Sequence, residues 1–92
     1  MSLETTVFTF KISVTFEEWA KVYDSEENIQ MNKDGGIICL YKGVKKDDPT
    51  SVILIKQGEE GKSISMFKDL AVKLLIESAG HIYDSTVMTS YF

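Results

Sequence analysis

The stretch GIICLYKGVKKDDPTSVILIKQ, residues 36–57, contains two apolar runs joined by a charged turn. The runs occupy residues 37–41 and 52–55, and the second consists entirely of aliphatic side chains. A strand with one face in water alternates apolar and polar residues, whereas a continuous apolar run indicates a strand covered on both faces. The stretch therefore predicts a β-hairpin with its turn at residues 45–50 and apolar side chains on both faces of its sheet.

Successive side chains of a strand point to opposite faces, which divides each run into two sets. In the second run, Val52 and Leu54 cover one face while Ile53 and Ile55 cover the other. In the first run, the same alternation places Ile37, Cys39 and Tyr41 on one face, and Ile38 and Leu40 on the other. Cys39 is the only cysteine of the chain, and we expect a buried, unreactive thiol in a reducing compartment.

The chain before the hairpin predicts a strand followed by helical segments. Residues 4–14 alternate, and the apolar face carries Phe8, Phe10, Ile12 and Val14. Thr15 and Glu18 then have the spacing of a capping box at a helix start. This helix has an apolar stripe formed by Phe16, Trp19, Ala20 and Tyr23. A shorter helical piece follows to about residue 33 and ends at the two glycines 35–36.

The chain after the hairpin predicts one long helix and a last strand. Ser63 or Ser65 is expected to cap the helix, which runs to Gly80 with an apolar stripe of Phe67, Leu70, Ala71, Leu74 and Leu75. Residues 81–92 have strand character, and regular alternation divides their apolar side chains into Ile82, Met88 and Phe92 on one face and Tyr83, Val87 and Tyr91 on the other.

The resulting order, strand, helix, strand, strand, helix, strand, is typical of a ferredoxin-like βαββαβ sandwich of the α+β class. Right-handed crossovers place the first and third strands in the centre of a four-stranded antiparallel sheet, with both helices on one face. We expect a single domain over residues 1–92. The second face would stay open to water, and burying several hundred Å² of it at roughly 25 cal/mol per Å² favours a homodimer whose sheets pack face to face.

The composition argues against several classes of partner. The formal net charge is −4 and the isoelectric point is about 4.9. A negative net charge disfavours binding to nucleic acid, because its phosphates are also negative. Neither a signal peptide nor an apolar stretch long enough to span a bilayer is visible, so we expect a cytoplasmic protein with no membrane partner.

Three sets of motifs resemble those of the dimeric α/β-barrel superfamily, and within it a group of short bacterial proteins of unknown function. They are Thr15-Phe16-Glu17-Glu18-Trp19 with Tyr23-Asp24-Ser25, Tyr41-Lys42-Gly43-Val44 before Asp47-Asp48-Pro49, and Glu77-Ser78-Ala79-Gly80-His81. The wider superfamily includes quinol-type monooxygenases and haem-degrading oxygenases, and the resemblance implies a ligand cleft between helices and sheet. Trp19 and His81 do not match the Asn, Trp and His pattern of the haem-cleaving members.

Motifs that suggest catalysis have simpler interpretations. Gly61-Lys62-Ser63 resembles the end of a phosphate-binding loop, but Lys56 occupies the position where that loop requires glycine. Asp47 and Asp48 before a proline indicate turn chemistry rather than a cation site. No metal site or cofactor is therefore expected.

His81 is the only side chain that titrates near neutral pH, and it is a weak candidate for a general base. The simpler interpretation is a residue that begins the last strand and bonds the end of the second helix. Aromatic residues with a polar tip line ligand clefts as readily as cores. The candidate cleft residues are Trp19, Tyr23, Tyr41 and His81.

Two functions remain open. The first is a non-enzymatic homodimer that binds a small apolar or aromatic molecule, or serves as an interaction module. The second is a cofactor-independent monooxygenase that acts on a quinol-like aromatic, with His81 as the base in a dry pocket.

Overall fold

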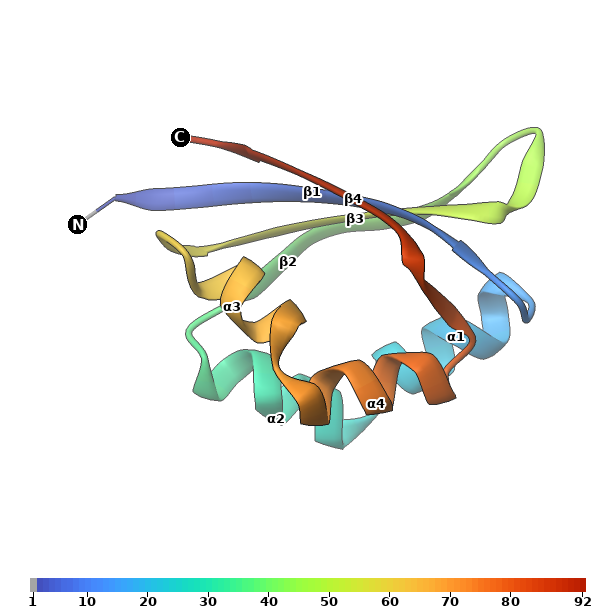
Figure 1. The fold of residues 1–92 in the computed structure, drawn as a ribbon, viewed down its shortest axis with the longest axis horizontal. Coiled ribbons are helices and arrows are strands. Elements are labelled where there is room, and N and C mark those ends of the chain that lie inside the picture. Colours follow the sequence, from blue (N-terminus) through green and yellow to red (C-terminus); the bar gives the residue numbers. More distant parts are fainter. Residues whose placement is uncertain (1) are drawn as a thin grey trace.

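The computed structural model describes residues 2–92 and contains a four-stranded sheet and four helices (Figure 1). The elements in chain order are β1 (Leu3–Ile12), α1 (Phe16–Tyr23), α2 (Glu26–Asp34), β2 (Ile38–Lys45), β3 (Asp48–Glu59), α3 (Lys62–Lys68), α4 (Leu70–Ser78) and β4 (His81–Tyr91). None of the helices within residues 2–92 has the length and apolar character needed to span a membrane.

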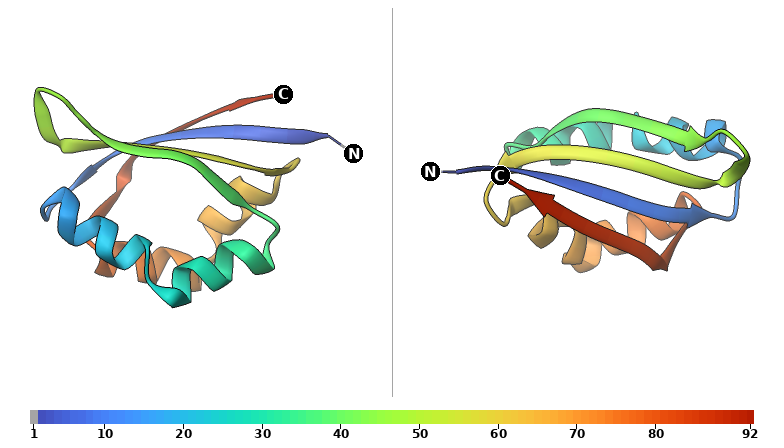
Figure 2. Two further views of the ribbon diagram at one scale, coloured as in Figure 1. Left: turned by 180° about the vertical axis from the view of Figure 1, so that it is seen from behind. Right: turned by 90° about the horizontal axis from the view of Figure 1, so that it is seen from above.

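The sheet confirms the predicted ferredoxin-like arrangement. Its strand order is β2-β3-β1-β4 with every neighbouring pair antiparallel, so β1 and β3 lie in the centre. All four helices lie on one face of the sheet, and no element covers the other face, which we call the open face (Figures 1 and 2). In the central pair, Phe8 is opposite Leu54 on the helix side, while Val7 is opposite Ile55 on the open face.

The hydrophobic core lies between the central strands and the helices. Its buried members are Phe8, Phe10, Ile12, Trp19, Val52, Leu54, Phe67 and Ala79. Most of the apolar face predicted for the first strand, the face of the third strand and Trp19 of the first helix are among them, while Val14, Phe16, Ala20 and Tyr23 are partly buried against this cluster. Thr15 begins α1 as predicted, since its hydroxyl oxygen accepts the backbone N–H of Glu18 at 3.1 Å.

The prediction of one long second helix is wrong, because the chain forms two shorter helices, α3 and α4, with a break at Asp69. The backbone there is extended (φ −66°, ψ 133°), and the Asp69 carboxylate accepts the amide of Ala71 at 2.9 Å as the cap of α4. An Asp side chain satisfies the free amides of a new helix well, which makes the break locally stable. The start of α3 was also mispredicted: the cap is Gly61 with φ +84°, not Ser63 or Ser65.

A bulge in β2 overturns the predicted faces of the first apolar run. Cys39 is opposite Lys56 and Tyr41 is opposite Ile55, so Leu40 is an extra residue in the edge strand. The bulge moves Tyr41 to the open face and leaves Cys39 on the helix side. The expectation of a buried thiol is therefore wrong: Cys39 is exposed, because β2 is an edge strand and the helices leave its flank open.

A second bulge alters the faces predicted for the last strand. Thr9 pairs with Val87 but Lys11 pairs with Ile82, so residues 83–86 do not follow regular alternation. As a result, Tyr83 and Met88 pack together against the core, whereas Ile82 and Val87 are exposed.

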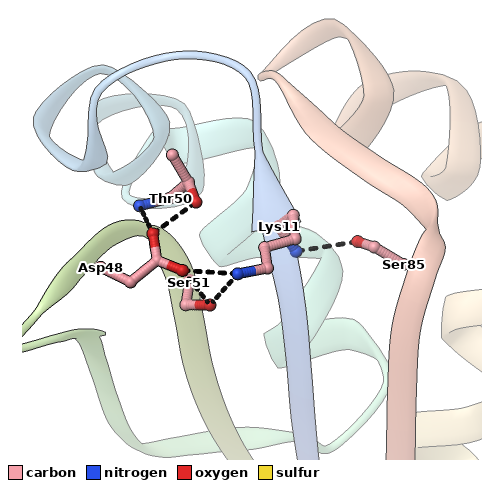
Figure 3. A network of polar contacts seen from close by, with 5 residues as sticks. All are labelled: Lys11, Asp48, Thr50, Ser51 and Ser85. Atoms are coloured by element: carbon pink, nitrogen blue, oxygen red, sulfur yellow. Dashed lines mark hydrogen bonds and ion pairs between the residues drawn. The ribbon is translucent and has the colours of Figure 1, made fainter.

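A polar network fixes the hairpin turn to this second bulge (Figure 3). The Lys11 ammonium donates to Asp48 Oδ2 and to Ser51 Oγ, both at 2.6 Å, and the Lys11 amide donates to Ser85 Oγ at 2.8 Å. Asp48 Oδ1 also accepts the amide of Thr50 at 3.0 Å, and these donors hold the pKa of Asp48 well below its usual range. The turn itself is shorter than the predicted 45–50: it comprises only residues 46–47, and Asp48 is the first residue of β3, paired with Lys45. Residues 2–92 contain no cluster of three His, Cys, Asp or Glu side chains that could hold a metal ion.

Candidate functional site

A small cavity lies between the sheet and the helices, and we call it the aromatic cavity. It is lined by Phe8, Phe10, Trp19, Tyr23, Asn28, Leu54, Lys56, Met66, Phe67, Val72, Ile76 and His81. Its volume of about 30 Å³ is room for about one water molecule. The cleft predicted between helices and sheet is therefore present in the fold, but the chain's own side chains almost fill it.

The rings around the cavity stack on one another. The Trp19 ring lies 5.2 Å from that of Tyr23 and 5.6 Å from that of Phe10, measured between centroids. His81 stacks on Phe10, with centroids 3.8 Å apart and planes at 7°. Central β1, helix α1 and the start of β4 thus bring Trp19, Tyr23 and His81 together. Tyr41, the fourth candidate, does not join them, because it lies on the open face and is 58% exposed.

His81 is buried in this stack and begins β4, as the simple interpretation predicts, but it does not bond the end of the preceding helix. Its Nε2 lies 2.7 Å from the hydroxyl of Thr86, not against the end of α4. Burial, helped by the nearby charge of Lys56, lowers the pKa of His81 to about 4. The imidazole is therefore neutral at pH 7 and is a weak base.

The low pKa of His81 predicts a pH-dependent stability. Between about pH 6.5 and pH 4, His81 is protonated in the unfolded chain but neutral in the folded chain. Since protons then bind the unfolded state preferentially, the unfolding free energy is highest above this window and decreases as the pH falls through it. We expect wild-type protein to lose about 2 kcal/mol more unfolding free energy between pH 7 and pH 5 than the His81→Phe variant. Urea denaturation of both proteins at the two pH values measures this difference. An equal loss in both proteins would contradict the assignment.

Lys56 is a cavity residue that sequence reasoning missed. Its ammonium lies 5.5 Å from the centroid of the Tyr23 ring and 5.8 Å from that of Phe8, and it donates to Asn32 Oδ1 at 3.2 Å. Burial lowers the pKa of Lys56 to about 8, so the group still carries its charge at pH 7. The signal was its position, because Lys56 continues the alternation of Val52 and Leu54 onto the helix side.

The Tyr23 hydroxyl is a further polar group at this wall. Its oxygen is buried and makes no hydrogen bond of good geometry within residues 2–92, although the side chains of Cys39 and Asn32 lie beside it. Burial, with further contributions from Cys39 and Asp24, raises the pKa of Tyr23 far above its ordinary value. The phenol is therefore a neutral donor at every physiological pH.

A larger surface groove lies on the other side of Tyr23, between α2 and β2, and we call it the α2–β2 groove. It has a volume of about 480 Å³ and is lined by Tyr23, Asp24, Ile29, Asn32, Lys33, Gly36, Ile37, Ile38, Cys39 and Lys42. Lys42 and Asp24 form an ion pair at 3.2 Å at its edge. Tyr23 lines both spaces and so forms part of the wall between groove and aromatic cavity.

The sequence profile described as "Domain of unknown function (DUF3764)" matches residues 3–92. No curated protein sequence matches the chain.

Several solved structures share the fold at low sequence identity. A NIPSNAP family protein from Agrobacterium tumefaciens is 14% identical over 99% of this chain and 92% of its own, with a TM-score of 0.66. SnoaB, a cofactor-independent oxygenase from Streptomyces nogalater, is 10% identical over 100% of this chain and 93% of its own, with a TM-score of 0.65. A dimeric protein of unknown function and ferredoxin-like fold from Bacteroides fragilis is 15% identical over 97% of this chain and 94% of its own, with a TM-score of 0.56. At these identities the likeness shows the fold alone.

Proposed function

This chain belongs to the DUF3764 family, a domain of unknown function, and we propose that it is a homodimer that binds a small apolar or aromatic molecule between its helices and its sheet. The observation that carries the ligand proposal is the aromatic cavity with the unpartnered hydroxyl of Tyr23 at its wall. Small-molecule sites are usually lined by apolar and aromatic side chains with a few polar groups and have volumes of about 300–1,000 Å³, so this cavity of about 30 Å³ must enlarge to hold a ligand.

The open face of the sheet supports the dimer. Ile38, Tyr41 and Val87 lie on this face and are 57%, 58% and 60% exposed. Val7 and Ile55 pair between them on the central strands, so an apolar surface extends across the sheet. Monomeric proteins rarely leave a contiguous apolar patch larger than about 300–600 Å² in water. A second copy has the same apolar face, and the Bacteroides fragilis protein with this fold is described as dimeric.

The wall of the cavity supports entry of a ligand larger than water. Met66 and Val72 lie on either side of the break at Asp69, and both also line a surface groove of about 400 Å³. A methionine side chain changes rotamer at low cost. We therefore infer that the cavity enlarges when Met66 moves toward this outer groove.

The proposal includes a single domain over the whole chain and a cytoplasmic location. The supporting observation for the location is the exposed Cys39, since reducing conditions keep such a thiol unoxidised.

Calorimetric titration with 2-naphthol, a neutral aromatic probe, tests the ligand site. We expect wild-type protein to bind the probe and the Val72→Trp variant to lose binding, because the larger ring would fill the cavity rim. Leu74→Trp, a substitution at an exposed position of the same helix, is the matched control and should bind normally. No binding to wild-type protein, or undiminished binding to Val72→Trp, would contradict the proposed site.

The alternative function is a cofactor-independent monooxygenase. It is supported by the presence of His81 in the cavity wall and by the fold shared with SnoaB. The low pKa of His81 makes it a poor base for a phenol, so we favour binding without turnover. If the wild-type protein consumed oxygen with 2-naphthol and the His81→Phe variant did not, the monooxygenase function would be favoured instead.

A further inference from the structure

We propose that the molecule bound at the aromatic cavity is a small aromatic anion, and that the Lys56 ammonium and the Tyr23 hydroxyl donate to its carboxylate or phenolate oxygen. This inference rests on the proposed function and adds the chemical class of the ligand. The whole chain carries a net charge of −4, so a local positive site for an anion is not a consequence of overall composition.

Lys56 is a cation without an anionic partner. Within residues 2–92 the ion pairs join Lys11 to Asp48 and Lys42 to Asp24, and no carboxylate lies within 4.0 Å of Lys56. An ammonium has three N–H donors, and within residues 2–92 the Lys56 ammonium makes one hydrogen bond, to Asn32 Oδ1. The rings of Phe8 and Tyr23 compensate part of the desolvation of the charge. Two donors of a charged group therefore remain unused at the cavity.

Tyr23 adds a further donor at the same wall. Its hydroxyl is buried and unpartnered, and its ring contacts the Lys56 ammonium. An ammonium with unused donors beside a phenol hydroxyl and no carboxylate within 4.0 Å favours an oxygen anion over a cationic group. The remaining wall is largely aromatic, which favours a planar ring as the body of the ligand.

The α2–β2 groove provides the route and additional room. Asn32, the partner of Lys56, lines this groove, and Tyr23 lines both groove and cavity. Rotation of the Tyr23 side chain would join the 480 Å³ groove to the Lys56 ammonium. The joined space is within the range of about 300–1,000 Å³ that is usual for small-molecule sites.

Calorimetry at pH 7 with 2-naphthoate and 2-naphthamide tests the inference, because the two probes share a ring and differ in charge. We expect wild-type protein to bind naphthoate about ten- to hundredfold more tightly than naphthamide, as expected for a hydrogen bond to a charged group. The Lys56→Met variant should lose this preference, so that its affinities for naphthoate and naphthamide become similar. Lys73→Met is the matched control, since Lys73 lies 4.8 Å from the Tyr83 ring outside the cavity.

The outcomes separate the two proposals. Equal affinities for both probes, in wild-type protein and in Lys56→Met, would overturn the anion inference and leave the aromatic site standing. If neither probe binds wild-type protein, the proposed function itself fails. If Lys56→Met does not fold by circular dichroism, Lys56→Gln removes the charge and Tyr23→Phe removes the hydroxyl donor, and each should weaken naphthoate binding selectively.

Discussion

The Ile55→Lys variant is expected to be a monomer at micromolar concentration, where the wild-type protein is a dimer. Ile55 lies on central β3, between Val7 of β1 and Tyr41 of β2, in the middle of the open face. In a face-to-face dimer the lysine would place two like charges in an apolar interface, and an unpaired buried charge costs several kcal/mol. Size-exclusion chromatography with light scattering measures the mass of the particle.

A matched control uses the same substitution on the helix side. Ile29 on α2 is 55% exposed, so Ile29→Lys makes the same chemical change away from the open face and should leave the dimer intact. Both variants should give the wild-type circular dichroism spectrum. A dimeric Ile55→Lys protein, or a monomer in the Ile29→Lys protein alone, would contradict an interface on the open face.

The Trp19→Ala variant is expected to lose about 3–5 kcal/mol of unfolding free energy. Trp19 is 2% exposed and contacts the rings of Phe10, Phe16 and Tyr23, so its removal leaves a large void beside the central strand. Small domains are stable by only about 5–15 kcal/mol, so this is a large fraction of the total. Urea denaturation at one fixed protein concentration measures the loss, since dimerisation makes stability depend on concentration.

Trp19→Phe is the control for this prediction, because it keeps an aromatic ring in the core. It should cost clearly less than the alanine variant. A loss below about 1 kcal/mol in Trp19→Ala would mean that Trp19 is not a core residue of the folded protein.

Much of the fold could be predicted because periodicity reports burial directly. The alternation around Phe8 and Phe10 identified the core face of β1, and the helical spacing of Trp19 and Tyr23 identified the inner face of α1. The order of strands then followed from right-handed crossovers. These features depend on many residues that agree, so single exceptions do not change the result.

The departures come from single residues that change local geometry. Leu40 adds one residue to an edge strand with only one hydrogen-bonded neighbour, and this shifts Tyr41 to the opposite face. Asp69 lies within an apolar pattern that continues on both sides, so the pattern alone could not show that its carboxylate would cap a new helix. Neither effect changes the average hydrophobicity of its segment.

The candidate site could be predicted only in part, for a related reason. Trp19, Tyr23 and His81 were selected by residue type and do meet at the aromatic cavity. Lys56 was not selected, because a lysine at the end of an apolar strand usually extends its charge into water. Only the three-dimensional arrangement shows that its ammonium lies between aromatic rings with no carboxylate nearby, within residues 2–92.

Native mass spectrometry of the freshly purified chain is the most direct test of the central claim, a homodimer with a small-molecule site. One spectrum reports both the number of subunits and any retained molecule. We predict a particle of twice the chain mass, with added mass where a ligand has been retained through purification. A bare monomer at micromolar concentration would contradict the account, because the apolar open face would then be stable in water without a second copy.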